Sequence, residues 1–138
     1  QLIENTENAF LDITLTDDNG INQSLSDLRG KVIVLDFSAI EMEQSSGYIF
    51  ELRELYNQYH KRGLAIYSVS LDRNKLLWED GVTNLPWTNV YAGDAATDVL
   101  TRYNVQSLPT LFLLDRKGNV QGRYTDFKKL DTDIQKYL

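Results

Sequence analysis

The sequence contains no cysteine and only one histidine, and these two scarcities exclude much chemistry. Without cysteine the chain forms no disulfide, presents no thiolate nucleophile and offers a metal no thiolate ligand. The single histidine, His60, cannot build a zinc site alone, and we expect it to be exposed on a polar helix face. A phosphate-binding glycine loop is also absent. The sequence therefore predicts no metal and no cofactor.

Positive charge and long apolar runs are scarce as well. The chain has 14 Lys and Arg against 20 Asp and Glu, a formal net charge of -6. Nucleic acids and anionic membranes attract basic surfaces, so we expect neither as a partner. No apolar run approaches the ~20 residues that span a bilayer, which predicts no membrane insertion by this domain. The first residues show no signal-peptide pattern, and two interpretations stay open: a trimmed chain or one domain of a longer one.

What is present suits one globular domain. The chain has 138 residues, of which 42% are hydrophobic, enough to bury a core without disulfides or metal. Residues 1–8 are polar, and we expect a disordered or linker lead-in there, followed by the folded domain over residues 9–138.

Strand and helix patterns alternate along this domain. An Asn-Gly turn at Asn19 and Gly20 predicts an N-terminal β-hairpin, and continuous apolar runs predict buried strands. Apolar residues spaced by three and four predict amphipathic helices. The expected strands after the hairpin are 32–37, 64–71, 87–91, 110–114 and 119–124. The first expected helix carries its apolar stripe from Tyr48 to Tyr59, and the later expected helices are 75–82, 95–103 and 130–138. Ser45 or Ser46 is the expected N-cap of the first helix. This order predicts an α/β fold, a mixed central β-sheet with helices on both faces.

Several short motifs, in this order and spacing, resemble those of one known family. They include Val32-Ile33-Val34-Leu35-Asp36-Phe37, Val69-Ser70-Leu71-Asp72, Ser107-Leu108-Pro109-Thr110 and Leu113-Leu114-Asp115-Arg116-Lys117-Gly118. From about Ala9 onward the chain resembles the thioredoxin-like superfamily, close to the extracytoplasmic thiol–disulfide oxidoreductases and related to the peroxiredoxins. The resemblance implies a thioredoxin-like fold and a cis peptide bond between Leu108 and Pro109.

The sequence departs from that family where its chemistry lies. The family carries Cys-x-x-Cys at the start of the helix, and an ungapped alignment places Met42 and Ser45 at these two positions. Met42 is a thioether that can neither ionise nor attack a disulfide. Glu41 and Glu43 add negative charge that would disfavour a thiolate nearby. The resemblance therefore implies a vestigial active site of Asp36, Glu41, Met42, Glu43 and Ser45, with no catalytic residue.

Other chemistry finds little support in the sequence. Ser45 would need an adjacent base to act as a nucleophile, and His60 lies about four helical turns away. Asp17, Asp18 and Asn19 lack the spacing of a calcium loop, so we interpret them as turn residues. Asp36 is retained without a thiol to serve, either because it bonds nearby groups or water or because it holds a polar pocket in use.

The leading functional hypothesis is a redox-inactive module that binds a protein or peptide. In the family, the backbone beside the cis-proline pairs with an extended substrate. Ser107, Leu108 and Pro109 match that segment, and Glu41, Met42 and Glu43 would complete the rim of the groove. The alternative is a domain of an oxidoreductase-type protein whose chemistry depends on another domain or on a partner's cysteine, and a purely structural remnant is a third possibility. By resemblance alone, the expected location is a bacterial periplasm or cell envelope.

Overall fold

The computed structural model describes residues 11–138, so the predicted lead-in at 1–8 lies outside the described residues. One seven-stranded mixed sheet runs through the domain in the order β2-β1-β5-β4-β3-β6-β7. The central pairs β3–β4 and β4–β5 are parallel, and the other pairs are antiparallel. The strands are β1 (Thr14–Asp17), β2 (Asn22–Ser24), β3 (Val32–Ser38), β4 (Leu64–Ser70), β5 (Thr88–Tyr91), β6 (Thr110–Leu114) and β7 (Val120–Tyr124).

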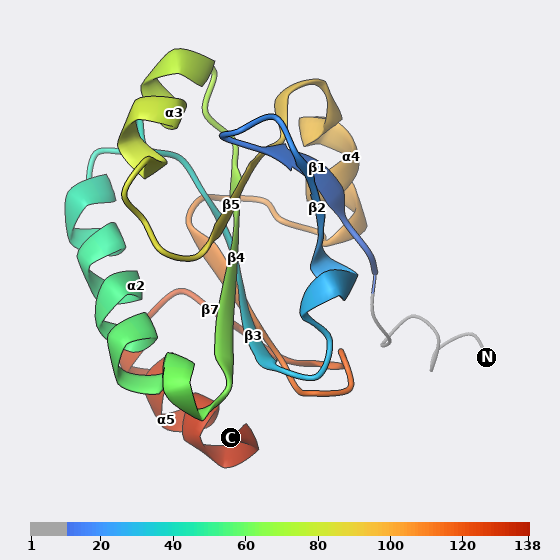
Figure 1. Cartoon of the computed structure of the whole chain (residues 1–138), viewed down its shortest axis with the longest axis vertical. Coiled ribbons are helices and arrows are strands. Elements are labelled where there is room, and N and C mark those ends of the chain that lie inside the picture. The colour runs from blue at the N-terminus through green and yellow to red at the C-terminus, as the bar shows by residue number, and fades with distance from the viewer. Residues whose placement is uncertain (1–10) are drawn as a thin grey trace.

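Four α-helices and three short 3-10 helices connect these strands. The α-helices are α2 (Ser45–Tyr59), α3 (Lys75–Val82), α4 (Ala96–Arg102) and α5 (Phe127–Tyr137), and the 3-10 helices are η1 (Leu25–Leu28), η2 (His60–Arg62) and η3 (Gly93–Ala95). Figure 1 shows α2, α3 and α5 on one side of the sheet and α4 on the other. This arrangement is the predicted α/β thioredoxin-like architecture with helices on both faces. None of the helices within residues 11–138 has the length and apolar character needed to cross a bilayer.

The sheet separates two apolar cores because successive residues of a strand point to opposite faces. In β3, Val32 and Val34 pack under α2 and α5, whereas Ile33, Leu35 and Phe37 pack on the α4 side. All of these side chains are buried, which is why the run reads as continuously apolar. The apolar stripe of α2 covers the first core with four buried residues, Tyr48, Leu52, Leu55 and Tyr59.

The predicted hairpin is present as β1 and β2. The turn between them places Gly20 at φ +80°, a left-handed conformation that glycine adopts without a steric penalty. The Asp17 carboxylate accepts hydrogen bonds from the backbone N–H groups of Asn19 and Ile21. Asp17 is the last residue of β1 and stabilises the turn through its side chain, whereas Asp18 and Asn19 are turn residues, as predicted.

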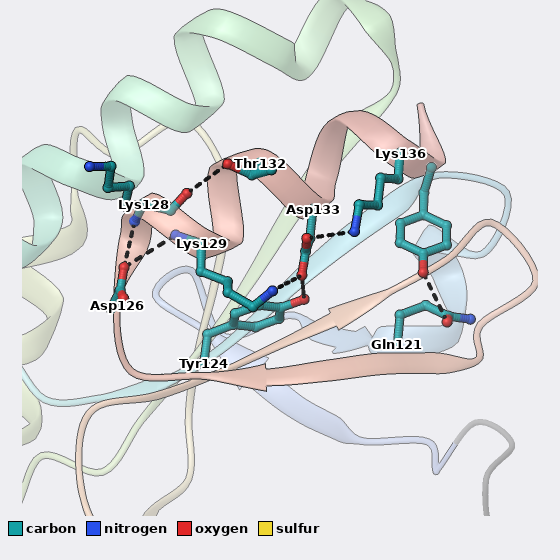
Figure 2. Close-up of polar contacts among 9 residues, drawn as sticks. Gln121, Tyr124, Asp126, Lys128, Lys129, Thr132, Asp133 and Lys136 are labelled. Carbon is teal, nitrogen blue, oxygen red and sulfur yellow. Dashed lines mark hydrogen bonds and ion pairs between the residues drawn. The ribbon is translucent and has the colours of Figure 1, made fainter.

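Helix α5 begins at Phe127, three residues before its predicted start. The Asp126 carboxylate caps it by accepting hydrogen bonds from Lys128 N (2.8 Å) and Lys129 N (3.2 Å), as Figure 2 shows. The Tyr124 hydroxyl of β7 donates to Asp133 at 2.6 Å and fixes the helix against the sheet. An acidic N-cap just after a strand was the signal that apolar periodicity alone missed.

His60 is half-buried, so the prediction that it is exposed was wrong. Its ring stacks on Tyr56 with centroids 4.4 Å apart, and Nδ1 lies 2.7 Å from the Tyr56 carbonyl oxygen. Since a carbonyl can only accept, Nδ1 carries the proton. The aromatic neighbour one helical turn earlier shields a side chain that we expected on a polar face.

Candidate functional site

The candidate site lies at the edge of the sheet where the parallel strands end. Ser38 pairs with Ser70, so the segments that follow β3 and β4 leave the sheet side by side. Phe37 pairs with Thr110 in the antiparallel β6, which brings the segment before β6 to the same edge. Loops far apart in the sequence therefore meet there, at the carboxyl ends where open α/β sheets commonly bind ligands.

The loop between β3 and α2 is held by a carboxylate from the next loop. Asp72, which is buried, accepts hydrogen bonds from Ile40 N (3.0 Å) and Glu41 N (2.8 Å). In return, the Glu41 carboxylate accepts a hydrogen bond from Arg73 N, in the loop that carries Asp72, at 2.9 Å. These three bonds hold the two loops together. They also occupy backbone N–H groups that could otherwise donate to a ligand.

Met42 and Ser45 occupy a single turn at the start of α2. Ser45 N donates to the Met42 carbonyl at 3.1 Å, which places residues i and i+3 next to each other. Met42 is half-buried and packs against the core beneath α2 and α5. The exposed methionine that the peptide hypothesis assumed is therefore only partly available.

The predicted N-cap at Ser45 or Ser46 was wrong, because Gln44 holds that position. Tyr48 N donates to the Gln44 carbonyl at 3.0 Å, which makes Gln44 the acceptor of the first helical bond and Ser45 the first helical residue. No side chain caps this end of the helix. The turn through Met42 already binds Ser45 N, so the helix starts without the help of a serine hydroxyl.

Asp36 lies beneath this loop and is 1% exposed. The Tyr48 hydroxyl donates to its Oδ1, and the Ser38 hydroxyl donates to Oδ2 at 3.1 Å. Burial raises the pKa of Asp36 to about 6, although the hydroxyls of Tyr48, Ser68 and Ser38 act in the opposite direction by favouring the carboxylate. Burial, together with the charge of Asp36, also raises the pKa of Tyr48 well above its usual value.

The remaining predicted site residues are mostly exposed. Leu108 is 39% exposed, Ser107 and Glu43 are also exposed, and Pro109 is half-buried. The Leu108–Pro109 peptide bond is cis. The Ser107 carbonyl accepts from the Thr110 hydroxyl at 2.7 Å, which anchors the segment to the start of β6. Within residues 11–138, Glu43 makes no hydrogen bond or ion pair.

Sequence reasoning did not count Asp72 among the site residues. The signal was an acidic residue two positions after the buried β4, at the sheet edge where β3 also ends. The part of the chain that the structure describes holds no group of three or more His, Asp or Glu side chains suited to an ion.

A mixed sheet covered on both faces, with a loop-to-helix turn and a proline segment at one edge, defines the thioredoxin-like class. A family model described as thioredoxin-like matches residues 30–120, and the chain belongs to this family. The thiol–disulfide oxidoreductase ResA of Geobacillus kaustophilus is 34% identical over 127 residues, which cover 92% of this chain and 72% of that protein.

Solved structures agree with this assignment. A thioredoxin-like protein from Bacteroides vulgatus is 38% identical, with a TM-score of 0.84 over 93% of this chain and 85% of that one. The thioredoxin domain of a thiol–disulfide oxidoreductase from the same organism is 26% identical, with a TM-score of 0.85 over 94% of both chains. The chain is thus a thioredoxin-like domain of the thiol–disulfide oxidoreductase type that contains no cysteine.

Proposed function

We propose that this domain does not exchange thiols and disulfides but binds an extended peptide segment of a partner protein. The observation that supports this proposal is that hydrogen bonds to Asp72 and Glu41 hold the loop between β3 and α2, although the chain has no cysteine. Asp72 holds Ile40 N and Glu41 N, so the loop keeps a defined shape beside the segment that precedes β6. A loop that had lost every role would not need these buried charge-assisted bonds.

The groove of this proposal combines an apolar and an acidic part. Leu108 would supply the exposed apolar side chain, and the exposed Glu41 and Glu43 would supply negative charge from the loop between β3 and α2. In this binding mode the backbone of the peptide would pair with the segment at Ser107 to Pro109, while alternate side chains meet the rim. The partner would be a peptide with apolar and basic residues, and the kinship with bacterial oxidoreductases makes a bacterial extracytoplasmic compartment the expected location.

The test is selection from a random peptide library displayed on phage, followed by affinity measurement with synthetic peptides. Selected peptides should bind the wild-type domain and bind Leu108→Asp at least ~10-fold more weakly. Val120→Asp is the matched control, because Val120 on β7 is 37% exposed, close to the 39% of Leu108. Failure to select any peptide, or equal binding to both variants, would contradict the groove.

A second measurement addresses redox inactivity. The domain should not accelerate reduction of a protein disulfide by dithiothreitol, and it should not consume peroxide in a coupled assay. Both reactions require a thiolate nucleophile, which the sequence does not supply. Turnover above the protein-free rate would overturn this part of the proposal.

A further inference from the structure

A row of buried polar side chains crosses the sheet beneath α2 and α3. Asp36 on β3 pairs with Ser68 on β4, and Ser68 pairs with Asn89 on β5. Directly paired residues project from the same face of a sheet, so these three side chains lie side by side. They are only 1%, 7% and 5% exposed. The residues two positions earlier on β3 and β4 point to the same face, and they are the apolar Val34 and Ile66.

Most polar groups around this row have partners. Asp36 accepts from Tyr48 and Ser38, and Asn89 Nδ2 donates to the Trp87 carbonyl at 2.9 Å. Two buried donors do not: among the described residues, the Trp87 indole Nε1 has no hydrogen-bond partner, and the Ser68 hydroxyl makes no hydrogen bond of good geometry, although it lies close enough to the Asp36 carboxylate to favour its ionised form. Buried polar groups are nearly always hydrogen-bonded, to protein or to ordered water, so both groups require an acceptor.

A cavity of about 30 Å³ adjoins all of these groups. Asp36, Ser68, Trp87 and Asn89 line it, together with apolar side chains, among them Leu52. A water molecule needs roughly 10–15 Å³ of such space and two to four polar partners. The volume therefore suits one or two water molecules and excludes a larger organic ligand.

We propose that this cavity is an internal water-binding site. The bound water accepts from Trp87 Nε1 and from the Ser68 hydroxyl and donates to the Asp36 carboxylate. Asp72 also lines the cavity, but its carboxylate already accepts from Ile40 N, Glu41 N and the Ser70 hydroxyl. Asp36 can accept further hydrogen bonds, since a carboxylate offers about four acceptor sites and the Tyr48 and Ser38 hydroxyls occupy two of them.

This site gives Asp36 a role that needs no cysteine. The carboxylate, the hydroxyl of Ser68 and the indole of Trp87 come from three different segments, and water joins them into one network. The network extends beneath Ala39 and Ile40, which line the same cavity. Hydration of the cavity therefore supports the floor of the loop that Asp72 holds from the side. The site stands independently of peptide binding.

The first test uses the wild-type protein. The indole N–H of Trp87 should show an NMR cross-relaxation peak to water with the sign of long-lived bound water, and a high-resolution crystal structure should place water within hydrogen-bond distance of Nε1. A dry cavity, or a protein acceptor on Nε1, would overturn the proposal.

The second test separates the hydroxyl of Ser68 from its volume. Ser68→Thr keeps a hydroxyl and Ser68→Val replaces it with a methyl group of the same shape, so the two variants differ only in the polar group. The water peak at Trp87 should persist in the threonine variant and be lost in the valine variant. Persistence in both variants would remove Ser68 from the site, whereas loss in both would show that the added methyl group displaces the water and would contradict a role for the hydroxyl.

Discussion

Asp36 is the residue whose environment differs most from what its chemistry prefers. It lies between Leu35 and Phe37 in the middle of a strand that is buried on both faces. The hydroxyls of Tyr48, Ser68 and Ser38 compensate for part of the lost hydration, but burial still has the larger effect and raises the pKa to about 6. The folded protein consequently holds a proton on this group more tightly than the unfolded chain does.

The Asp36→Asn variant should reveal this linkage through the pH dependence of stability. In the wild type, stability from Asp36 is fully present below its ordinary pKa of 3.8 and is lost as the pH rises through about 6. The two-unit shift corresponds to about 3 kcal/mol. Urea unfolding should therefore show the variant gaining about 3 kcal/mol relative to wild type between pH 4 and pH 7. Glu43→Gln serves as an exposed control and should show no such trend.

The Tyr48→Phe variant tests the strongest donor to Asp36. Removing the hydroxyl takes away a hydrogen bond that favours the carboxylate, so the pKa of Asp36 should rise above 6. The variant should also lose about 1.5–3 kcal/mol of stability at pH 7, the usual range for a bond to a charged group. Carbon-13 NMR titration of the Asp36 carboxyl measures the pKa. An unchanged or lower value would mean that Tyr48 does not stabilise the ionised form.

At the scale of elements, the loop between β3 and α2 depends on its neighbour. Asp72 reaches across from the end of β4, and Glu41 reaches back to Arg73 N. This reciprocal pairing of side chains with backbone donors gives the loop its shape without any help from the helix cap, since no side chain caps α2. The loop's order should therefore depend on the carboxylate of Asp72 more than on α2 itself.

Asp72→Asn should loosen this loop while the sheet stays intact. An amide has one oxygen in place of two and cannot accept from both Ile40 N and Glu41 N through separate oxygens. Hydrogen exchange at these two amides should accelerate at least ~10-fold, with a loss of about 1.5–3 kcal/mol in global stability. Glu43→Gln is again the control. Exchange rates that match wild type would show that Asp72 does not hold the loop.

Helix α5 should depend on its acidic cap. Asp126→Ala removes the acceptor for Lys128 N and Lys129 N and should cost about 1 kcal/mol in urea unfolding. Asp126→Asn should recover most of that loss, because asparagine caps helices as well as aspartate does. Equal losses in the two variants would point to the charge of Asp126 and not to its hydrogen bonds. Figure 2 shows the cap beside the contact between Tyr124 and Asp133.

The whole molecule is built so that distant segments share one edge of the sheet. The parallel β3 and β4 end there, the antiparallel β6 begins there, and the candidate site occupies the space between their loops. Two cores, one on each face, support this edge, and the chain has no cysteine that could form a disulfide. The scaffold of a thiol–disulfide oxidoreductase is thus retained although its reactive groups are missing.

Cysteines introduced at positions 42 and 45 should show whether this scaffold still supports disulfide formation and exchange. Met42→Cys with Ser45→Cys should form an internal disulfide under mild oxidation, because Ser45 N already bonds to the Met42 carbonyl in one turn. The double variant should reduce protein disulfides slowly, since Glu41 and Glu43 oppose a thiolate at position 42. Adding Glu43→Gln should lower the thiol pKa, measured by the pH dependence of alkylation, and leave the contact of Glu41 with Arg73 in place. Failure to form the disulfide would mean that Met42 and Ser45 are not the cysteine positions.

Much of the fold could be predicted from local pattern. The continuous apolar run at 32–37 predicted β3. The spacing of three and four residues between apolar side chains from Tyr48 to Tyr59 predicted α2. The N-cap at Gln44 and the early start of α5 could not be predicted, because each depends on which donor binds which acceptor within one turn. The half-buried position of His60 likewise depended on the stacking of its ring on Tyr56.

By itself, the sequence determined that this domain has no thiol chemistry and that Asp36 lies in a buried strand, since residue types and their periodicity suffice for both. Only the tertiary structure decided what surrounds Asp36. Ser68 and Asn89 join it because three strands pair in one register, and Asp72 joins the loop because β3 and β4 end together. The physical reason is that periodicity tells which face a side chain occupies, whereas its neighbours across the sheet depend on strand order and register, which are fixed by contacts distant in the chain.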